Sequence, residues 1–303
     1  MTDPIQPPFA QLLDVLDLRP AGDGRYEAGS MNLGWKRIYG GQVIAQALVA
    51  ATRTVPEDRA VHSLHAYFLR PGDPEVPVTF EVDRLRDGGS FTARHARASQ
   101  NGRAILTLSA SFKTTEAGLS HHEPMVEAPA PEDLPSIPEL MAEQLSFLPE
   151  HIKQYWLKRR PLELRPIGLD HYVSREPLPP TQNIWLRAVM DGLSGHQTDE
   201  QKAEPGLAAA IIAYLSDMTL LDTSLFPHGR SIFNNDLQVA SIDHAMWFHT
   251  SPTMEHLKDW LFYQQSSPAS DRGTGLAMGG IYNREGRRLV SVAQEGLIRV
   301  RTS

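Results

Sequence analysis

The chain has 303 residues, a formal net charge of −7, and 41% hydrophobic and 21% charged residues, values that fit a globular protein of about two domains. The sequence has no cysteine, which excludes disulfides, thiolate metal sites and a cysteine nucleophile, and its acidic balance argues against a nucleic-acid surface. The N-terminal stretch "MTDPIQPPFAQLLDVLDL" lacks the features of a signal peptide, and no window approaches ~18 uncharged apolar residues. We therefore predict a soluble, cytoplasmic protein with no membrane span.

The first half of the sequence predicts one helix followed by strands. "GGQVIAQALVAATRTV" (40–55) is rich in alanine and free of proline, which indicates a helix. Four segments between 60 and 115 then alternate apolar and polar residues. The turn sequences "DGGS" and "QNGR" separate the last three, and Asn-Gly between alternating runs is a strong hairpin signal. We expect an antiparallel meander of four strands.

Residues 116–160 have a different composition. "EAPAPEDLPSIPEL" combines prolines and acids, and "ELMAEQLSFLPEHIKQYWLKR" is typical of a helix. We expect a linker that packs on the surface between an N-terminal unit, 1–115, and a C-terminal unit, 161–303.

The same order of elements then returns. "NIWLRAVMDG" is typical of a strand, "AEPGLAAAIIAYLSDM" predicts a second alanine-rich helix, and four further strands are expected between 238 and 300. "LHAYFLRPG" (64–72) matches "DHAMWFHTSP" (243–252), which indicates an internal repeat. Two helices, each lying on a curled antiparallel sheet, would give an α+β fold in which the second copy covers the open edge of the first.

Several common catalytic motifs are absent from this sequence. There is no Gly-x-Ser-x-Gly nucleophile elbow and no Gly-x-x-x-x-Gly-Lys phosphate loop. "HHEPM" (121–125) is not a zinc-binding helix motif, and "GTGLAMGG" (273–280) lies between strands rather than in a dinucleotide-binding unit. We predict no metal and no cofactor.

Three lone polar residues interrupt apolar elements. Asp217 ends the second helix, while Ser241 and Gln294 lie in mostly apolar strands. Each has an ordinary explanation, because an aspartate after a helix is often a turn residue, and strand serines and glutamines are commonly satisfied or solvent-facing. Patterns of this kind do not by themselves assign a reaction.

Four stretches together resemble the type II acyl-CoA thioesterases, the TesB-like family. They are "RIYGGQVIAQALVAA", the run from "VHSLHAYFLRPG" to "SQNG", "SIDHAMWFH" and "VSVAQEGLIR". The resemblance covers nearly the whole chain. It implies a double-hotdog fold, two helix-wrapped antiparallel sheets fused in one chain, and hydrolysis of fatty acyl-CoA to a free fatty acid and CoA. It also implies that Asp217, Ser241 and Gln294 hold a catalytic water.

The chemistry needs donors for the developing oxyanion as well as a base. Helix starts leave backbone N–H groups unpaired, so Gly40 and Gly41 are the predicted oxyanion and substrate-binding positions. Burial and the helix C-terminus would raise the pKa of Asp217 towards that of a useful base. Ala110 falls opposite Gln294 when the two repeats are superposed on their glycine turns, which predicts one active site per chain.

Several points stay open at this level. Arg70, Arg86, Arg94 and Arg272 are all candidates for holding the CoA phosphates, and the acyl chain length is not determined. The segment "MDGLSGHQTDEQKAEPGL" (190–207) is longer than expected for the family and could reshape the entrance. Alternative functions are a hydratase acting on enoyl-CoA, for which the usual Asp–His pair is lacking, and a non-catalytic acyl-CoA binder. We expect a homodimer or larger homo-oligomer.

Overall fold

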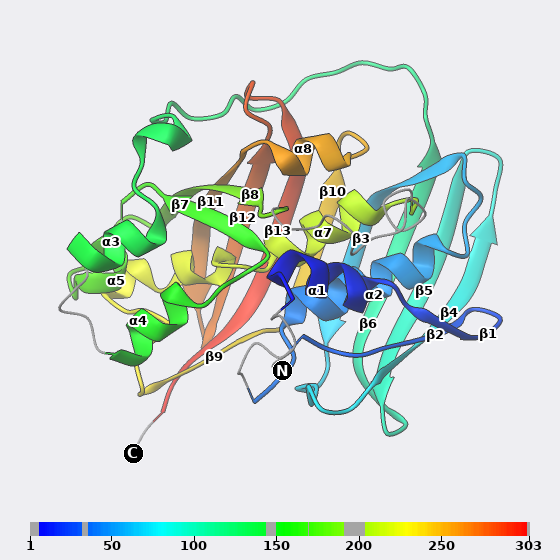
Figure 1. The fold of residues 1–303 in the computed structure, drawn as a ribbon, viewed down its shortest axis with the longest axis horizontal. Coiled ribbons are helices and arrows are strands. Elements are labelled where there is room, and N and C mark those ends of the chain that lie inside the picture. The colour runs from blue at the N-terminus through cyan, green and yellow to red at the C-terminus, as the bar shows by residue number, and fades with distance from the viewer. Residues whose placement is uncertain (1–5, 32–35, 144–149, 169, 191–203, 302–303) are drawn as a thin grey trace.

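A buried helix followed by antiparallel strands forms the N-terminal part of the computed structural model, which describes residues 6–31, 36–143, 150–168, 170–190 and 204–301 (Figure 1). The helix predicted over 40–55 is α2 (Gly40–Thr52), and every residue from Gly41 to Ala51 is buried. The strands that follow it are β3 (Arg59–Phe68), β4 (Val78–Asp87), β5 (Phe91–Gln100) and β6 (Arg103–Thr114). A helix and a hairpin that the sequence analysis missed precede them: α1 (Pro8–Leu16), β1 (Arg19–Gly22) and β2 (Arg25–Ala28).

The order of these strands differs from the predicted four-strand meander. Strands β4, β5 and β6 do form a meander, and Asn101 and Gly102 take the positive φ values of 48° and 73° that a tight hairpin turn requires. Strand β3, however, pairs with β6 and not with β4. The connecting segment 69–77 contains three prolines and cannot make a tight turn, so the chain crosses to the other side of the meander.

The predicted linker region runs along the C-terminal strands. Residues 115–130 form no helix or strand, and they are followed by η1 (Pro131–Asp133), α3 (Ile137–Glu143) and α4 (Glu150–Leu157), with 144–149 outside the described residues. Trp185 donates from Nε1 to the carbonyl oxygen of Pro129 at 2.9 Å, and Arg288 pairs with Glu123 at 2.9 Å. These contacts hold the segment against the second half.

The C-terminal half repeats the pattern of a buried helix on antiparallel strands. Its helix is α7 (Leu207–Ser216), and the segment predicted as one strand over 238–252 is two, β9 (Leu237–Ser241) and β10 (Asp243–Phe248), with Ile242 between them. Residues 191–203 of the long segment before α7 lie outside the described residues. The other elements of this half are β7 (Leu162–Pro166), α5 (Asp170–Val173), β8 (Thr181–Ala188), η2 (Leu220–Ser224), η3 (Phe226–His228), α8 (Met254–Lys258), β11 (Leu261–Asp271), β12 (Thr274–Tyr282) and β13 (Arg288–Val300).

The two halves share one sheet and press their helices together. Within the described residues the sheet has 13 strands in the order β1-β2-β4-β5-β6-β3-β10-β13-β12-β11-β8-β7, and β9 pairs with β13. Antiparallel pairing of β3 with β10 joins the halves, because each supplies the edge partner that the other lacks. Helices α2 and α7 contact each other between the halves (Figure 1). The start of α2 and the end of α7 therefore meet at this boundary.

One helical stretch among the described residues, Leu207–His228, is long and apolar enough by length and composition to cross a membrane. It contains Asp217 and Asp222, so it is not a run of ~18 uncharged apolar residues, the limit used for the prediction from the sequence. The stretch comprises α7 and two short 3₁₀ helices, and 83% of its apolar window is buried inside the protein. Such burial is typical of a core helix.

Candidate active site

The end of helix α7 places a carboxylate at the boundary between the halves. All residues of α7 from Leu207 to Ser216 are buried, and the helix stops at Asp217. The stop is enforced two residues later, where Thr219 adopts a left-handed φ of 68°, a rare conformation for a β-branched residue. Gln265, buried on β11, donates to the Thr219 hydroxyl at 2.9 Å and helps to hold this turn. The chain is thus held in an unfavourable conformation next to the acid.

The carboxylate of Asp217 accepts three hydrogen bonds from the protein. Gln294 donates from Nε2 to Oδ1 at 2.5 Å, and Ser241 donates from Oγ to the same oxygen at 3.2 Å. Gly41 donates its backbone N–H to Oδ2 at 2.8 Å. Gln294 Nε2 also lies 3.1 Å from the Ser241 hydroxyl oxygen. The three residues predicted from the sequence motifs are therefore in mutual contact.

Strand β13 brings Ser241 and Gln294 together. Ser241 is the last residue of β9 and pairs with Gly296 of β13, two residues from Gln294. A Cβ on Gly296 would collide with the side chain of Leu221, which would have to move. The pairing with β13 breaks at Ile242, where the register shifts by one residue, and resumes in β10. This break lets the Ser241 hydroxyl face the end of α7.

The start of helix α2 approaches Asp217 more closely than the sequence analysis expected. A Cβ on Gly40 would lie 2.7 Å from Asp217 Oδ2, and one on Gly41 would collide with the carbonyl oxygen of Tyr214, so neither position tolerates a side chain without movement. Tyr39, just before α2, donates its hydroxyl to the same Tyr214 carbonyl at 2.9 Å. The N–H of Gly41 was expected to be free, but Asp217 occupies it. Gly40 lines the cavity described below, beside this contact.

The environment of Asp217 changes its acidity. Burial raises the pKa of this carboxyl group from 3.8 to about 6, against the lowering effect of its three hydrogen-bond donors and of the positive charge on Arg37. The phenol of Tyr263, which donates to the Ser216 carbonyl at 2.8 Å, has a pKa raised by burial and by the Asp217 charge. A carboxylate with this pKa is ionised at neutral pH and is a stronger base than an exposed aspartate.

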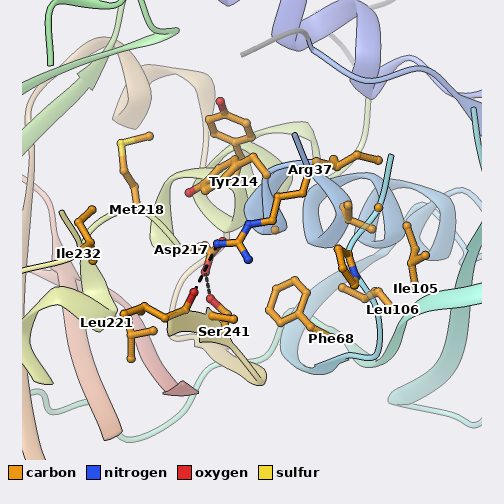
Figure 2. A pocket seen from close by; sticks show the side chains of 18 of the residues that line it. Arg37, Phe68, Ile105, Leu106, Tyr214, Asp217, Met218, Leu221, Ile232 and Ser241 are labelled. Atoms are coloured by element: carbon orange, nitrogen blue, oxygen red, sulfur yellow. Dashed lines mark hydrogen bonds between the residues drawn. The ribbon is translucent and has the colours of Figure 1, made fainter. Parts of the chain in front are cut away.

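A cavity of about 790 Å³ opens beside the carboxylate. Asp217 and Ser241 line it, whereas Gln294 is completely buried behind them. In Figure 2 the apolar side chains lie on both sides of the acid, with Phe68, Ile105 and Leu106 from the N-terminal half on one side. On the other side are Met218, Leu221 and Ile232. The volume and the apolar walls suit a ligand with a hydrophobic chain.

Four cations line the same cavity: Arg37, Arg70, Lys158 and Arg160. Of the four arginines considered from the sequence, the structure places only Arg70 there. Arg94 is buried and bonded to Asp87 at 2.6 Å, and Arg272 lies on the exposed turn between β11 and β12. The sequence analysis missed the other three lining cations, although the basic run "LKRR" (157–160) at the end of the linker was a usable signal.

The backbone arrangement is that of a double hotdog, an α+β fold in which two sheets each wrap a central helix, as predicted. Solved structures of similar sequence have the same fold. Acyl-CoA thioesterase II TesB2 from Mycobacterium marinum is 36% identical, with a TM-score of 0.74 over 96% of this chain and 99% of that one. The tesB protein of Mycobacterium avium subs paratuberculosis is 31% identical, with a TM-score of 0.76 over the same shares of both chains.

Sequence comparison assigns the family. Residues 28–113 match the model of the acyl-CoA thioesterase N-terminal domain, and residues 196–297 match that of acyl-CoA thioesterase. The chain is 34% identical to acyl-CoA thioesterase 2 of Haemophilus influenzae over 95% of its length and 96% of that protein. It is 36% identical to acyl-coenzyme A thioesterase 8 of Mus musculus over 95% of its length and 88% of that protein. The chain belongs to the acyl-CoA thioesterase family.

Proposed function

We propose that this protein hydrolyses fatty acyl-CoA to a free fatty acid and CoA, using a water activated by Asp217. The observation that carries the proposal is the ionised carboxylate on the cavity wall, held by Gln294 and Ser241 on one oxygen and by Gly41 on the other. A carboxylate has about four acceptor positions. The three protein donors leave one, on Oδ2 next to the start of α2, for a water.

The reaction follows from this arrangement. The water oxygen attacks the thioester carbonyl carbon while Asp217 takes a proton from the water. The carbon–sulfur bond then breaks, CoA leaves as the thiolate, and the proton returns from Asp217 to solvent or to the thiolate. Ser241 and Gln294 fix the carboxylate and so contribute by positioning.

The developing negative charge on the carbonyl oxygen needs a donor close to the attacked carbon. Gly41 keeps its N–H on Asp217 in the structure, so in our proposal Gly40, which lines the cavity at the first position of α2, is the main oxyanion donor. Both glycines remain necessary, since a side chain on either would occupy the contact between α2 and α7.

The cavity lining has apolar and cationic residues that suit the two chemical parts of an acyl-CoA. Its apolar walls suit the acyl chain, and Arg37, Arg70, Lys158 and Arg160 suit the phosphates of CoA, because guanidinium and ammonium groups are the usual phosphate donors in proteins. We propose one active site per chain. Ala110, which falls opposite Gln294 in the repeat, is apolar and cannot hold a carboxylate in the N-terminal half.

The alternative functions make different predictions for the same assay. In the described residues no histidine contacts the Asp217 carboxylate, which disfavours a hydratase that works through an Asp–His pair. Incubation with saturated acyl-CoA substrates of several chain lengths, read with a thiol-reactive dye, should release free CoA catalytically. Stoichiometric binding without thiol release would favour the non-catalytic binder, and hydration of an enoyl-CoA without thiol release would favour the hydratase.

Three further features belong to the proposal. The N-terminal unit 1–115, linker 116–160 and C-terminal unit 161–303 are the division we propose. A cytoplasmic location and a homo-oligomeric state, most simply a homodimer, are proposed as well. Light scattering at micromolar concentration tests the assembly, and a mass of 33.7 kDa, that of one chain, would contradict it.

A further inference from the structure

A buried histidine lies directly behind the candidate active site. His244 of β10 is 0% exposed, and neither of its ring nitrogens contacts the carboxylate. Its Nε2 lies 2.8 Å from the hydroxyl of Ser216, the last residue of α7, and its Nδ1 lies 3.2 Å from Nε2 of Gln294. The ring therefore bridges the end of α7 to the glutamine that holds Asp217.

Ser216 determines which ring nitrogen carries the proton. When its hydroxyl donates to the carbonyl oxygen of Ala213, 3.0 Å away, the hydroxyl oxygen accepts from His244. The ring must then carry its proton on Nε2 and leave Nδ1 as an acceptor. Burial lowers the pKa of His244 to about 3, which keeps the ring neutral across the range in which Asp217 titrates.

The bare Nδ1 in turn fixes the side-chain amide of Gln294. Only the NH₂ group of the amide can donate to Nδ1, and its second hydrogen then points to Asp217 Oδ1, 2.5 Å away, and to the Ser241 hydroxyl oxygen, 3.1 Å away. This orientation leaves Gln294 Oε1 buried without a hydrogen-bond partner, a costly state for an acceptor. An orientation kept at such a cost is imposed by the groups around it.

We infer that His244 is a positioning residue, which holds the Gln294 amide so that it always donates to Asp217 and cannot turn. The inference rests on the proposed function of Asp217. The restraint by His244 has its effect when Asp217 becomes protonated and no longer attracts the NH₂ group of Gln294. Without His244 only the Ser241 hydroxyl would hold the NH₂ group, and a hydroxyl can donate as well as accept. The amide would then turn, accept the new carboxyl proton on Oε1, and stabilise the neutral acid, which raises the pKa of Asp217. His244 prevents this and keeps the base ready for the next water.

The N-terminal half supports this assignment by contrast. On strands β3 and β6, the facing pair Leu64 and Ala110 is apolar and buried, and Ala110 is the residue that falls opposite Gln294 when the glycine turns of the two repeats are superposed. The polar pair His244 and Gln294 occurs in the half that carries the acid.

The test uses two substitutions that differ in where they place a polar atom. In His244→Asn the amide oxygen can occupy the position of Nδ1 and accept from Gln294. In His244→Gln the amide reaches the position of Nε2, near Ser216, and leaves Gln294 without an acceptor. Val292→Ala is the matched control, because Val292 is 1% exposed on the same face of β13 and its truncation opens a cavity without touching a hydrogen bond.

The readout is the pH dependence of kcat/KM for acyl-CoA hydrolysis. The value of kcat/KM should fall on the acidic side as Asp217 is protonated. We expect His244→Gln to raise the midpoint of this acid limb by about one pH unit, which lowers kcat/KM about tenfold on the limb and much less above pH 8. His244→Asn should keep the midpoint of the wild type. If His244→Gln does not fold, Ser216→Ala, which removes the acceptor that fixes the tautomer, should shift the limb in the same direction.

The inference is overturned if His244→Gln or Ser216→Ala lowers the rate equally at every pH with an unmoved midpoint, as expected for Val292→Ala. It is also overturned if His244→Asn shifts the limb as far as His244→Gln does. Failure of the wild-type protein to hydrolyse any acyl-CoA would instead refute the proposed function, so the two failures are distinguishable.

Discussion

Replacing Asp217 by asparagine distinguishes an aspartate that acts as a catalytic base from one that only forms a turn. Asp217→Asn keeps the size of the side chain and removes the base. Loss of a general base typically costs 10²- to 10⁴-fold in rate, so we expect kcat to fall by about that range. KM should change little, because the substrate walls are untouched. The wild-type kcat/KM should rise through the pKa of about 6, and the residual activity of the variant should lack that limb.

The same substitution should raise stability above pH 6. The folded pKa of Asp217, about 6, lies above the ordinary 3.8, so the folded protein binds this proton more tightly than the unfolded chain does. Stability therefore falls as the pH rises from about 4 through 6. Relative to a pH at which the carboxyl group is protonated in both states, the titration of Asp217 lowers the free energy of unfolding by about 1.6 kcal/mol at pH 5 and by about 3 kcal/mol at pH 8. Asparagine does not ionise and avoids this loss. Its NH₂ group cannot accept a hydrogen bond, so one of the three donors loses its acceptor, which lowers the free energy of unfolding by about 1 kcal/mol.

Urea unfolding at pH 5 and pH 8 measures the difference. We expect Asp217→Asn to be more stable than the wild type by about 2 kcal/mol at pH 8, with an advantage that shrinks by about 1.4 kcal/mol at pH 5. A turn-forming aspartate predicts near-normal kcat and a loss of stability at both pH values. That pair of results would refute the reasoning about Asp217.

Three further predictions concern the groups around Asp217. Gly41→Ala should lower both the melting temperature and kcat, because its Cβ collides with the last turn of α7 and displaces Asp217, and a misplacement of about 1 Å can cost about 10²-fold in rate; a variant that melts and turns over normally would place the α2–α7 contact elsewhere. The double variant Asp217→Asn/Gln294→Ala should be barely slower than the worse single variant, whereas multiplied losses would mean separate roles. Arg70→Ala should raise KM for acyl-CoA about tenfold without raising it for an acyl thioester of N-acetylcysteamine, which has no phosphates; Arg272→Ala is the exposed control, and equal KM changes for both substrates would remove Arg70 from phosphate binding.

The sequence predicts the local elements of this fold better than their arrangement. The alanine-rich run that became α2 and the Asn-Gly turn at Asn101 and Gly102 are local signals, and both helix and hairpin are where the pattern placed them. The pairing of β3 with β6 is a non-local feature that alternation of residues does not encode, although the three prolines in 69–77 were a usable signal against a tight turn after β3. The split of one predicted strand at Ile242 is non-local as well, since β9 and β10 both pair with β13 and the register shifts by one residue between Ser241↔Gly296 and Ala245↔Ala293.

Some residues of the candidate site could be predicted from the sequence, and others depend on how the helices and strands pack. The family resemblance selected Asp217, Ser241 and Gln294, and the structure brings their side chains into hydrogen-bond contact. The occupied N–H of Gly41 could not be foreseen, because it depends on how closely α2 and α7 pack. His244 was also missed, since a histidine in an apolar strand carries no signal of its partners until the strands are in register.

The central claim is that a water held by Asp217 attacks the thioester directly, without an acyl-enzyme. A single turnover in ¹⁸O-labelled water, with enzyme in excess over acyl-CoA, tests it by mass spectrometry of the fatty acid and of the peptide that contains Asp217. Direct attack predicts one ¹⁸O atom in the fatty acid from the first turnover and an unlabelled Asp217. An unlabelled fatty acid together with ¹⁸O in the Asp217 carboxylate would show that the aspartate itself attacks the carbonyl, and would contradict this account.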